Sequence, residues 1–126
     1  MSSENLHEPI DKLKPETINI HRAIVSLMEE LEAIDWYRQR ADACTDTQLR
    51  AILEHNMNEE IEHASMALEW IRRNVPKFDE ALRTYLFSSG NVIEIEKAVE
   101  AGEKESVAAT DERPKNRATI GDMKGS

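Results

Sequence analysis

Two short segments of the chain carry the residue types of a metal site. Residues 29–32 hold three glutamates, and about thirty residues later the spaced pair Glu60 and His63 follows. A carboxylate dimetal centre in a helical bundle takes one Glu from each of two helices and a Glu-x-x-His from each of two others. This chain has one helix of each kind: one that supplies a single Glu and one that supplies a Glu-x-x-His. Either the pattern is accidental, or two identical chains complete the site on a two-fold axis.

The helical positions of these side chains favour the metal site. Glu60 and His63 are three residues apart, so they project from one face of a helix, and that face is apolar. Glu30 lies at the edge of the apolar stripe of the preceding helix. An ionised carboxylate in an apolar interface costs several kcal/mol unless a charge compensates it. A bound cation would supply that compensation and lower the pKa of the carboxyl group.

The ligand types narrow the choice of metal. Carboxylates with one imidazole per half-site and no thiolate suit iron or manganese better than structural zinc or copper. Two symmetric half-sites would hold two metal ions, and two Fe(II) ions can each lose one electron to O₂. Tyr37 follows Glu30 by about two helical turns on the same face. It either approaches the metals and their ligands or serves as an interface aromatic residue.

Two further sets of side chains have the spacing of weaker cation sites. They are Glu29 and Glu32 with Trp36 close by, and His55 with Glu59 and Glu62. The first set would form a shallow entry site near the two-fold axis, and the second an outer site on another helix face. On the residues alone, a solvated acidic face is the preferred interpretation of the first set, and the second set is a weak candidate for a cation site.

The elements that must position these residues are helices. Apolar residues recur at steps of three and four over residues 15–42, without an interrupting Gly or Pro. Thr45 with Gln48 reads as a capping box that opens a second long helix, which Pro76 ends. A shorter helix is predicted over residues 78–86, and further amphipathic turns over 92–105. Two long helices and one short one leave apolar stripes exposed, so a second subunit is expected to complete a four-helix bundle.

Composition supports an all-α protein and limits its partners. The 126 residues are 33% charged and 5% aromatic, with 4 Gly, 4 Pro and a net charge of −9. An acidic chain argues against nucleic acid and anionic membranes as partners. No apolar run reaches the roughly 18 residues of a membrane span. Cys44 is the single cysteine, which excludes an intrachain disulfide and fits a reducing, cytoplasmic compartment.

From residue 7 to about residue 87 the chain resembles the encapsulated ferritins, ferritin-like iron oxidases packed inside encapsulin shells. The segments that carry the resemblance are residues 21–26 (HRAIVS), 28–33 (MEELEA), 35–37 (DWY), 55–56 with 59–60 and 62–63, 68–70 (LEW) and 83–87 (RTYLF). The resemblance implies a ferritin-like half-bundle with two long antiparallel helices and a short C-terminal helix. It also implies a ferroxidase with two irons per subunit pair.

The resemblance assigns a role to each candidate residue. The ferroxidase ligands correspond to Glu30, Glu60 and His63, with Tyr37 beside the centre. The entry site for calcium or another divalent cation, and the outer site, correspond to the two sets already described: Glu29, Glu32 and Trp36, then His55, Glu59 and Glu62. Other activities for the same ligands are a diiron or dimanganese peroxidase and a metal-sequestering module without redox turnover.

The resemblance also predicts assembly and domain organisation. Five homodimers would form an open ring, a decamer, and an encapsulin shell would enclose the iron mineral that an open ring cannot. Residues 1–8 are expected to be a flexible N-terminus, 9–101 the helical domain and 102–117 a disordered linker. Residues 118–126, which include Ile120 and Met123, resemble a cargo-loading peptide that docks on the shell.

Overall fold

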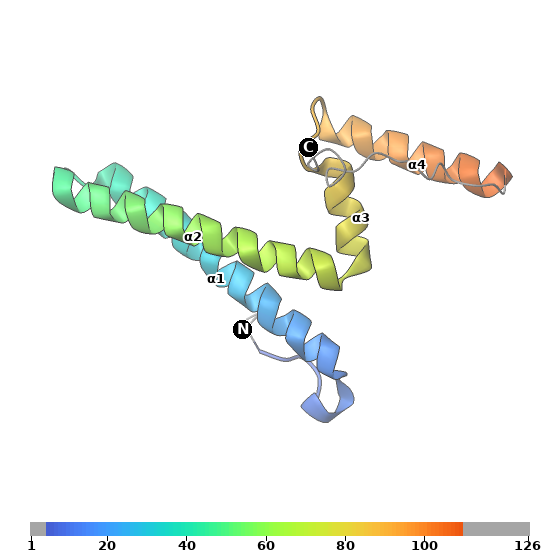
Figure 1. Ribbon diagram of the computed structural model, residues 1–126, viewed down its shortest axis with the longest axis horizontal. Coiled ribbons are helices and arrows are strands. Elements are labelled where there is room, and N and C mark those ends of the chain that lie inside the picture. Colours follow the sequence, from blue (N-terminus) through green and yellow to red (C-terminus); the bar gives the residue numbers. More distant parts are fainter. Residues whose placement is uncertain (1–4, 110–126) are drawn as a thin grey trace. The chain divides into compact units, whose positions relative to one another are not determined.

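The computed structural model describes residues 5–109, and its regular elements in that range are all helical (Figure 1). A short 3₁₀ helix, η1, spans Ile10–Lys12, and α1 (Pro15–Ala43) and α2 (Thr47–Asn74) are the two long helices. They are followed by α3 (Pro76–Tyr85) and α4 (Val92–Ala109). The chain divides into two compact units after Pro76, and each is described by itself. The predicted all-α class is confirmed.

The ends of α1 and α2 follow from local chemistry. Pro15 stands in the first turn of α1, where its missing N–H is no loss. The N-cap of α2 is Asp46, whose Oδ1 accepts a hydrogen bond of 2.8 Å from the backbone N–H of Leu49. The predicted cap at Thr45 was therefore one residue early. A carboxylate is the better cap here because it also interacts favourably with the helix dipole.

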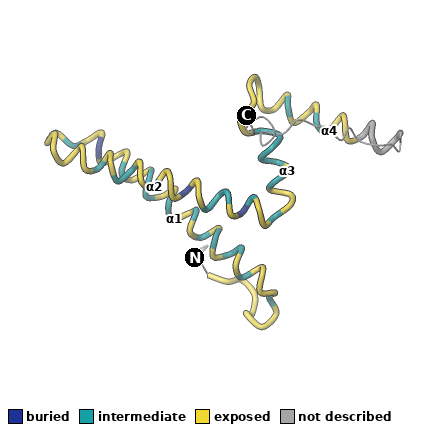
Figure 2. Tube along the Cα trace, in the orientation of Figure 1, coloured by how far each residue is buried: buried dark blue, intermediate teal, exposed yellow. Residues whose placement is uncertain are grey.

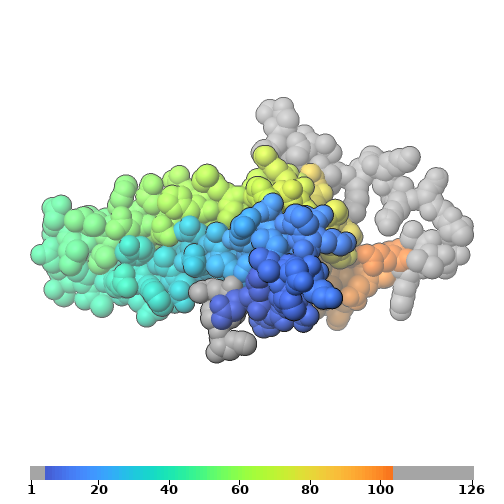
Figure 3. All heavy atoms as spheres, turned by 90° about the horizontal axis from the view of Figure 1, so that it is seen from below, coloured from blue at the N-terminus to red at the C-terminus, as the bar shows by residue number. Residues whose placement is uncertain are grey.

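The first unit is an antiparallel hairpin of α1 and α2. The two helices lie side by side over most of their length in both views (Figures 1 and 3). Only Ala41, Ala64 and Ile71 are buried apolar residues among the described part of the chain (Figure 2). Small alanines let the helix backbones approach, but three residues are a very small core. Several large apolar side chains of the hairpin are accordingly exposed to solvent.

The second unit contains α3 and α4, joined by a tight connection. Gly90 has a φ of 91°, a conformation that glycine adopts without steric cost. The side chain of Asn91 then caps α4, because its Oδ1 accepts from the backbone N–H groups of Ile93 and Glu94 at 2.8 and 3.1 Å.

Helix α4 continues further than expected. It ends at Ala109, whereas a disordered linker was predicted from residue 102. The reason is that Gly102 is an isolated glycine among strong helix formers such as Ala, Glu and Lys. The remainder of that predicted linker and the candidate cargo-loading peptide at 118–126 lie outside the described residues, as do residues 1–4 of the predicted N-terminal segment.

Candidate metal centre

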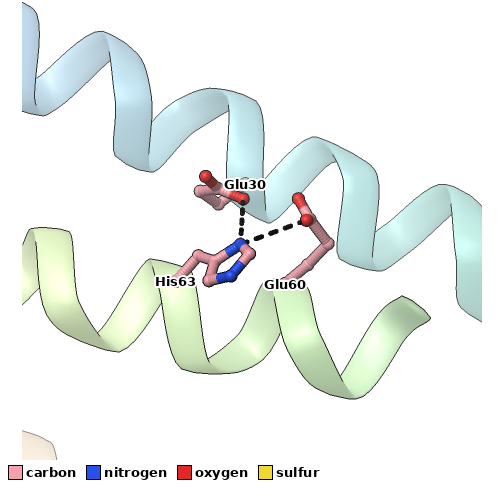
Figure 4. Close-up of side chains that lie close together, drawn as sticks. All are labelled: Glu30, Glu60 and His63. Atoms are coloured by element: carbon pink, nitrogen blue, oxygen red, sulfur yellow. Dashed lines mark ion pairs between the residues drawn. The ribbon is translucent and has the colours of Figure 1, made fainter. Parts of the chain in front are cut away.

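Three side chains from the two long helices meet on the surface of the hairpin. Glu30 comes from the middle of α1, and Glu60 and His63 come from neighbouring turns of α2 (Figure 4). The Nδ1 atom of His63 lies 3.3 Å from Oε1 of Glu60 and 3.8 Å from Oε2 of Glu30. One ligand atom from each residue can be chosen so that all three lie within 4.8 Å of one another. The antiparallel hairpin thus gathers two carboxylates and an imidazole.

The carboxyl group of Glu60 disfavours the ionised form of Glu30. The Glu60 carboxyl shares a hydrogen bond with Glu30 and thereby raises the pKa of Glu30 above its ordinary value of 4.5. Burial, the charge of Glu60 and the charge of Glu29 act in the same direction, whereas His63 opposes them. Two carboxylates this close together each disfavour ionisation of the other unless a cation neutralises them. His63 alone therefore does not balance the negative charge of the two carboxylates.

The site is open on one side. The side chains of Glu30 and Glu60 are each 24% exposed, and that of His63 is 47% exposed. Leu31 and Ile61, which follow the two glutamates, are themselves exposed at 53% and 40%. Oxygen and imidazole ligands of this kind suit Fe or Mn, and one atom from each of the three residues fills about half of the roughly six coordination positions of such an ion. The donors fit a metal ion, and the open side leaves room for more ligands.

Among the described residues, the structure brings into one possible metal-binding group only the three predicted ligands of the ferroxidase centre. The remaining predicted residues of the entry and outer sites are all exposed: Glu29, Glu32, Trp36, His55, Glu59 and Glu62. Within one chain these six do not form a comparable group. Tyr37 is partly buried, and the guanidinium of Arg40 lies 5.4 Å from the centre of its ring.

The sequence patterns identified every member of the group that the structure assembles. They missed the hydrogen bond between the Glu30 and Glu60 carboxyls. No spacing rule predicts it, because it depends on how far the two helices are shifted along each other. The patterns also gave no sign that His63 would turn the same nitrogen atom, Nδ1, towards both carboxylates.

Within residues 5–109, no helix is both long enough and apolar enough to cross a membrane.

Comparison with known proteins agrees with this architecture. The EncFtn-like family model matches residues 5–89, which include both long helices and α3. An encapsulated ferritin-like protein from Rhodospirillum rubrum is 63% identical over 102 residues, which are 81% of this chain and 73% of that protein. The encapsulin nanocompartment cargo protein EncC from Myxococcus xanthus is 37% identical over 107 residues, 79% of this chain and 80% of that protein.

A solved structure shows the same fold. The crystal structure of a protein from Nitrosomonas europaea superposes with a TM-score of 0.68 at 55% sequence identity, and the match covers 70% of this chain and 97% of that one. The predicted fold, two long antiparallel helices with shorter helices after them, is confirmed. With the family model spanning most of the chain and close relatives aligned over four fifths of it, the chain belongs to the EncFtn-like family.

Proposed function

We propose that the chain is one half of a ferroxidase that oxidises Fe(II) to Fe(III) at a diiron site between two subunits. The observation that carries this proposal is the group Glu30, Glu60 and His63, whose ligand atoms converge within 4.8 Å on an open face. The group has too much negative charge for its own chain to balance, as the raised pKa of Glu30 indicates. A divalent cation would remove that imbalance.

Two copies supply what one copy lacks. Each chain contributes two carboxylates and one imidazole, so a symmetric pair contributes the complete set of a dimetal centre in a four-helix bundle. The exposed apolar residues beside the ligands support the pairing. Leu31 and Ile61 would leave water when a second hairpin covers them, and each side chain of this size contributes roughly 1.5–3 kcal/mol when fully buried.

In the oxidation of Fe(II), the protein needs only to bind the ions and to favour the product charge. Two Fe(II) ions, the substrate, each give up one electron, and O₂ accepts both electrons with two protons to give hydrogen peroxide. Glu30, Glu60 and His63 hold the ions close together and favour the higher charge of Fe(III). Glu60 raises the pKa of Glu30, and a bound iron ion would oppose that shift because it favours the ionised carboxylate.

Further residues are proposed to act around the centre, as in the encapsulated ferritins that the chain resembles. Tyr37 would lie beside the iron ligands of the assembled pair. Cation entry would use Glu29, Glu32 and Trp36 with calcium or another divalent ion, and an outer site would use His55, Glu59 and Glu62. These six side chains are exposed, which leaves them accessible to ions arriving from solvent.

The proposed partners are further copies of the chain and an encapsulin shell. The relative EncC is named as an encapsulin nanocompartment cargo protein, which supports a cytoplasmic cargo role for this chain as well. Homodimers would assemble into a decameric ring inside the shell. Ile120→Asp with Met123→Asp in the full chain should abolish co-purification with a co-expressed encapsulin if residues 118–126 load it. Unchanged co-purification would contradict that role.

The activity is tested by adding Fe(II) to the full-length protein under argon and then admitting air. A ferric absorbance that rises much faster than in protein-free buffer supports the ferroxidase. Tight Fe(II) binding without faster oxidation would instead identify a metal-sequestering module. A turnover that requires added hydrogen peroxide and consumes an organic reductant, with iron or manganese bound, would identify a peroxidase.

A further inference from the structure

A groove of about 240 Å³ lies between α3 and α4, within the second compact unit of the chain. We call it the α3–α4 groove. Its charged and aromatic lining consists of Lys77, Glu80 and Tyr85 from α3 and of Glu96, Glu100 and Glu103 from α4. Four of these six side chains are carboxylates and one is an amine, so the groove has an excess of three negative charges.

The three glutamates that α4 contributes are not balanced by the side chains around them. They stand at positions i, i+4 and i+7, so they form one line along the helix, and like charges at this spacing repel each other. Lys77 already pairs with Glu80 at 3.4 Å, and Lys97 pairs with Glu94 at 3.7 Å. Among the side chains that the structure describes, none of the three has an ion-pair partner. A basic ligand would supply one.

The most basic stretch of the sequence follows α4 closely. Residues 113–117 (RPKNR) contain three bases and no acid, and no other five-residue stretch of the chain has three lysines or arginines. These residues lie outside the described part of the chain, so only their sequence is used here. The bases alternate with other residues, which places all three on the same side of an extended chain. Pro114 favours an extended chain because it disfavours the helical conformation for the residue before it.

The distance from the end of α4 back to the groove suits this segment. Helix α4 ends at Ala109, and Glu100 lies about 14 Å back along the helix axis. Four extended residues carry the chain from Ala109 to Arg113 over at most about 14 Å. Eight carry it to Arg117 over roughly 28 Å, whereas Glu96 lies only about 20 Å back. The three bases can therefore stand level with the three glutamates.

We infer that residues 113–117 of each chain bind in the α3–α4 groove of the same chain. The three bases face the three glutamates, and the ring of Tyr85 offers a face on which a guanidinium group can stack. The short connection keeps the segment at a millimolar effective concentration, so ion pairs that are individually weak are sufficient. Residues 118–126, the candidate cargo-loading peptide, then begin beside α4 instead of beyond its end.

The first test treats the full-length protein with a carbodiimide, which joins a lysine to a carboxylate only when the two are in contact. Residues 113–117 contain one lysine, Lys115, and Lys124 is the reference lysine further along the same segment. Peptide mass spectrometry should find Lys115 joined to the three α4 glutamates at least about tenfold more often than Lys124. In 1 M salt this preference should disappear, because salt screens exposed ion pairs. Equal joining of the two lysines at low salt would overturn the inference.

A second measurement uses trypsin, which cuts after Lys115 and Arg117 only when this stretch is free to enter its active site. Replacing Glu96, Glu100 and Glu103 together by Gln should speed these two cuts at least about fivefold and leave the cut after Lys124 unchanged. Gln is about as good a helix former as Glu, so far-UV circular dichroism should stay the same. Glu94→Gln, which changes α4 outside the groove, is the control and should give the parent rates. Parent rates in the triple variant as well would contradict the inference.

A third arrangement asks which copy supplies the segment. A chain with Lys115→Arg has no lysine within residues 113–117, and a chain with the three Gln changes has no carboxylates from α4 in its groove. When the two chains are co-expressed, links between Lys115 and these glutamates can form only between copies, and we expect none. Links at the level of the parent protein would mean that a neighbouring copy fills the groove, and the inference would be wrong. All three measurements are made without iron, so their outcome is independent of the ferroxidase proposal.

Discussion

Helix α2 carries two charged clusters that behave in opposite ways. At its last turns Glu69 accepts hydrogen bonds from Arg72 at 2.8 Å and from Arg73 at 2.6 Å. The two guanidinium groups lower the pKa of Glu69 from 4.5 to about 2. Nearer the middle of the same helix, Glu60 meets Glu30 instead, and the pKa of Glu30 is raised.

The difference separates a structural carboxylate from the carboxylates that we propose bind a metal ion. The chain provides Glu69 with its own cations, and these basic residues also suit the negative end of the helix dipole. It provides Glu30 and Glu60 with only a half-exposed histidine. A cluster whose charge is balanced within the chain holds a helix end together, whereas one that is left unbalanced is ready for an external cation.

The largest effect is expected when the unbalanced cluster loses a ligand. Glu60→Gln or His63→Ala should lower the initial rate of Fe(II) oxidation at least about a hundredfold, because each pair of chains loses two ligands. The rate is measured from the ferric absorbance after air is admitted. Glu69→Gln is the matched control on the same helix and should keep the parent rate. A Glu60→Gln variant that assembles normally and oxidises iron at the parent rate would show that the ligands are assigned wrongly.

Binding of the ion should stabilise the protein. At a free Fe(II) concentration about a hundredfold above the dissociation constant, linkage adds about 2.7 kcal/mol to the free energy of unfolding. Thermal melting under argon should therefore shift upward with Fe(II) in the parent protein and in Glu69→Gln, and should not shift in His63→Ala. An equal shift in all three proteins would mean that the ion binds elsewhere.

Without metal, removing a charge from the same cluster is expected to stabilise the protein, by a smaller amount than iron binding does. The pKa of Glu30 is raised in the folded protein, so its contribution to stability is complete below pH 4.5 and is lost as the pH rises through the folded pKa. Glu30→Gln removes the charge and can still donate a hydrogen bond to Glu60. The variant should match the parent at low pH and melt at a higher temperature at pH 7 in a chelator. A lower melting temperature at pH 7 would contradict this electrostatic description.

The smallest effect is expected at the balanced cluster. The pKa of Glu69 is lowered, so its contribution to stability is present above pH 4.5 and is lost as the pH falls towards 2. Solvent and salt screen these exposed groups, so Glu69→Gln should destabilise only slightly at pH 7, and less in 1 M salt. The free energy of unfolding is measured by urea unfolding at low salt and in 1 M salt. A large, salt-independent loss would point to packing by the side chain instead.

The sequence was sufficient for the elements with strong local signals. The uninterrupted apolar spacing of residues 15–42 predicted α1, and the segment around Pro76 predicted the end of α2. The boundary errors came from competing local signals. Asp46 outcompeted Thr45 as a cap, and Gly102 did not stop α4 because one glycine costs only about 1 kcal/mol in a helix.

The candidate site was predictable in its members but not in its geometry. The spacing of Glu60 and His63 puts them on one helix face, and this rule holds for any α-helix. Which residue of α1 lies opposite them depends on the packing of the two helices, so the hydrogen bond between Glu30 and Glu60 needed the structure.

The central claim, that one chain holds half of an iron site, is tested most directly by native mass spectrometry of the full-length protein with Fe(II) under argon. We expect iron only on species with an even number of chains, at two ions per pair, and none on single chains. Single chains that hold two ions, and that turn ferric on admission of air as fast as the pairs do, would contradict it.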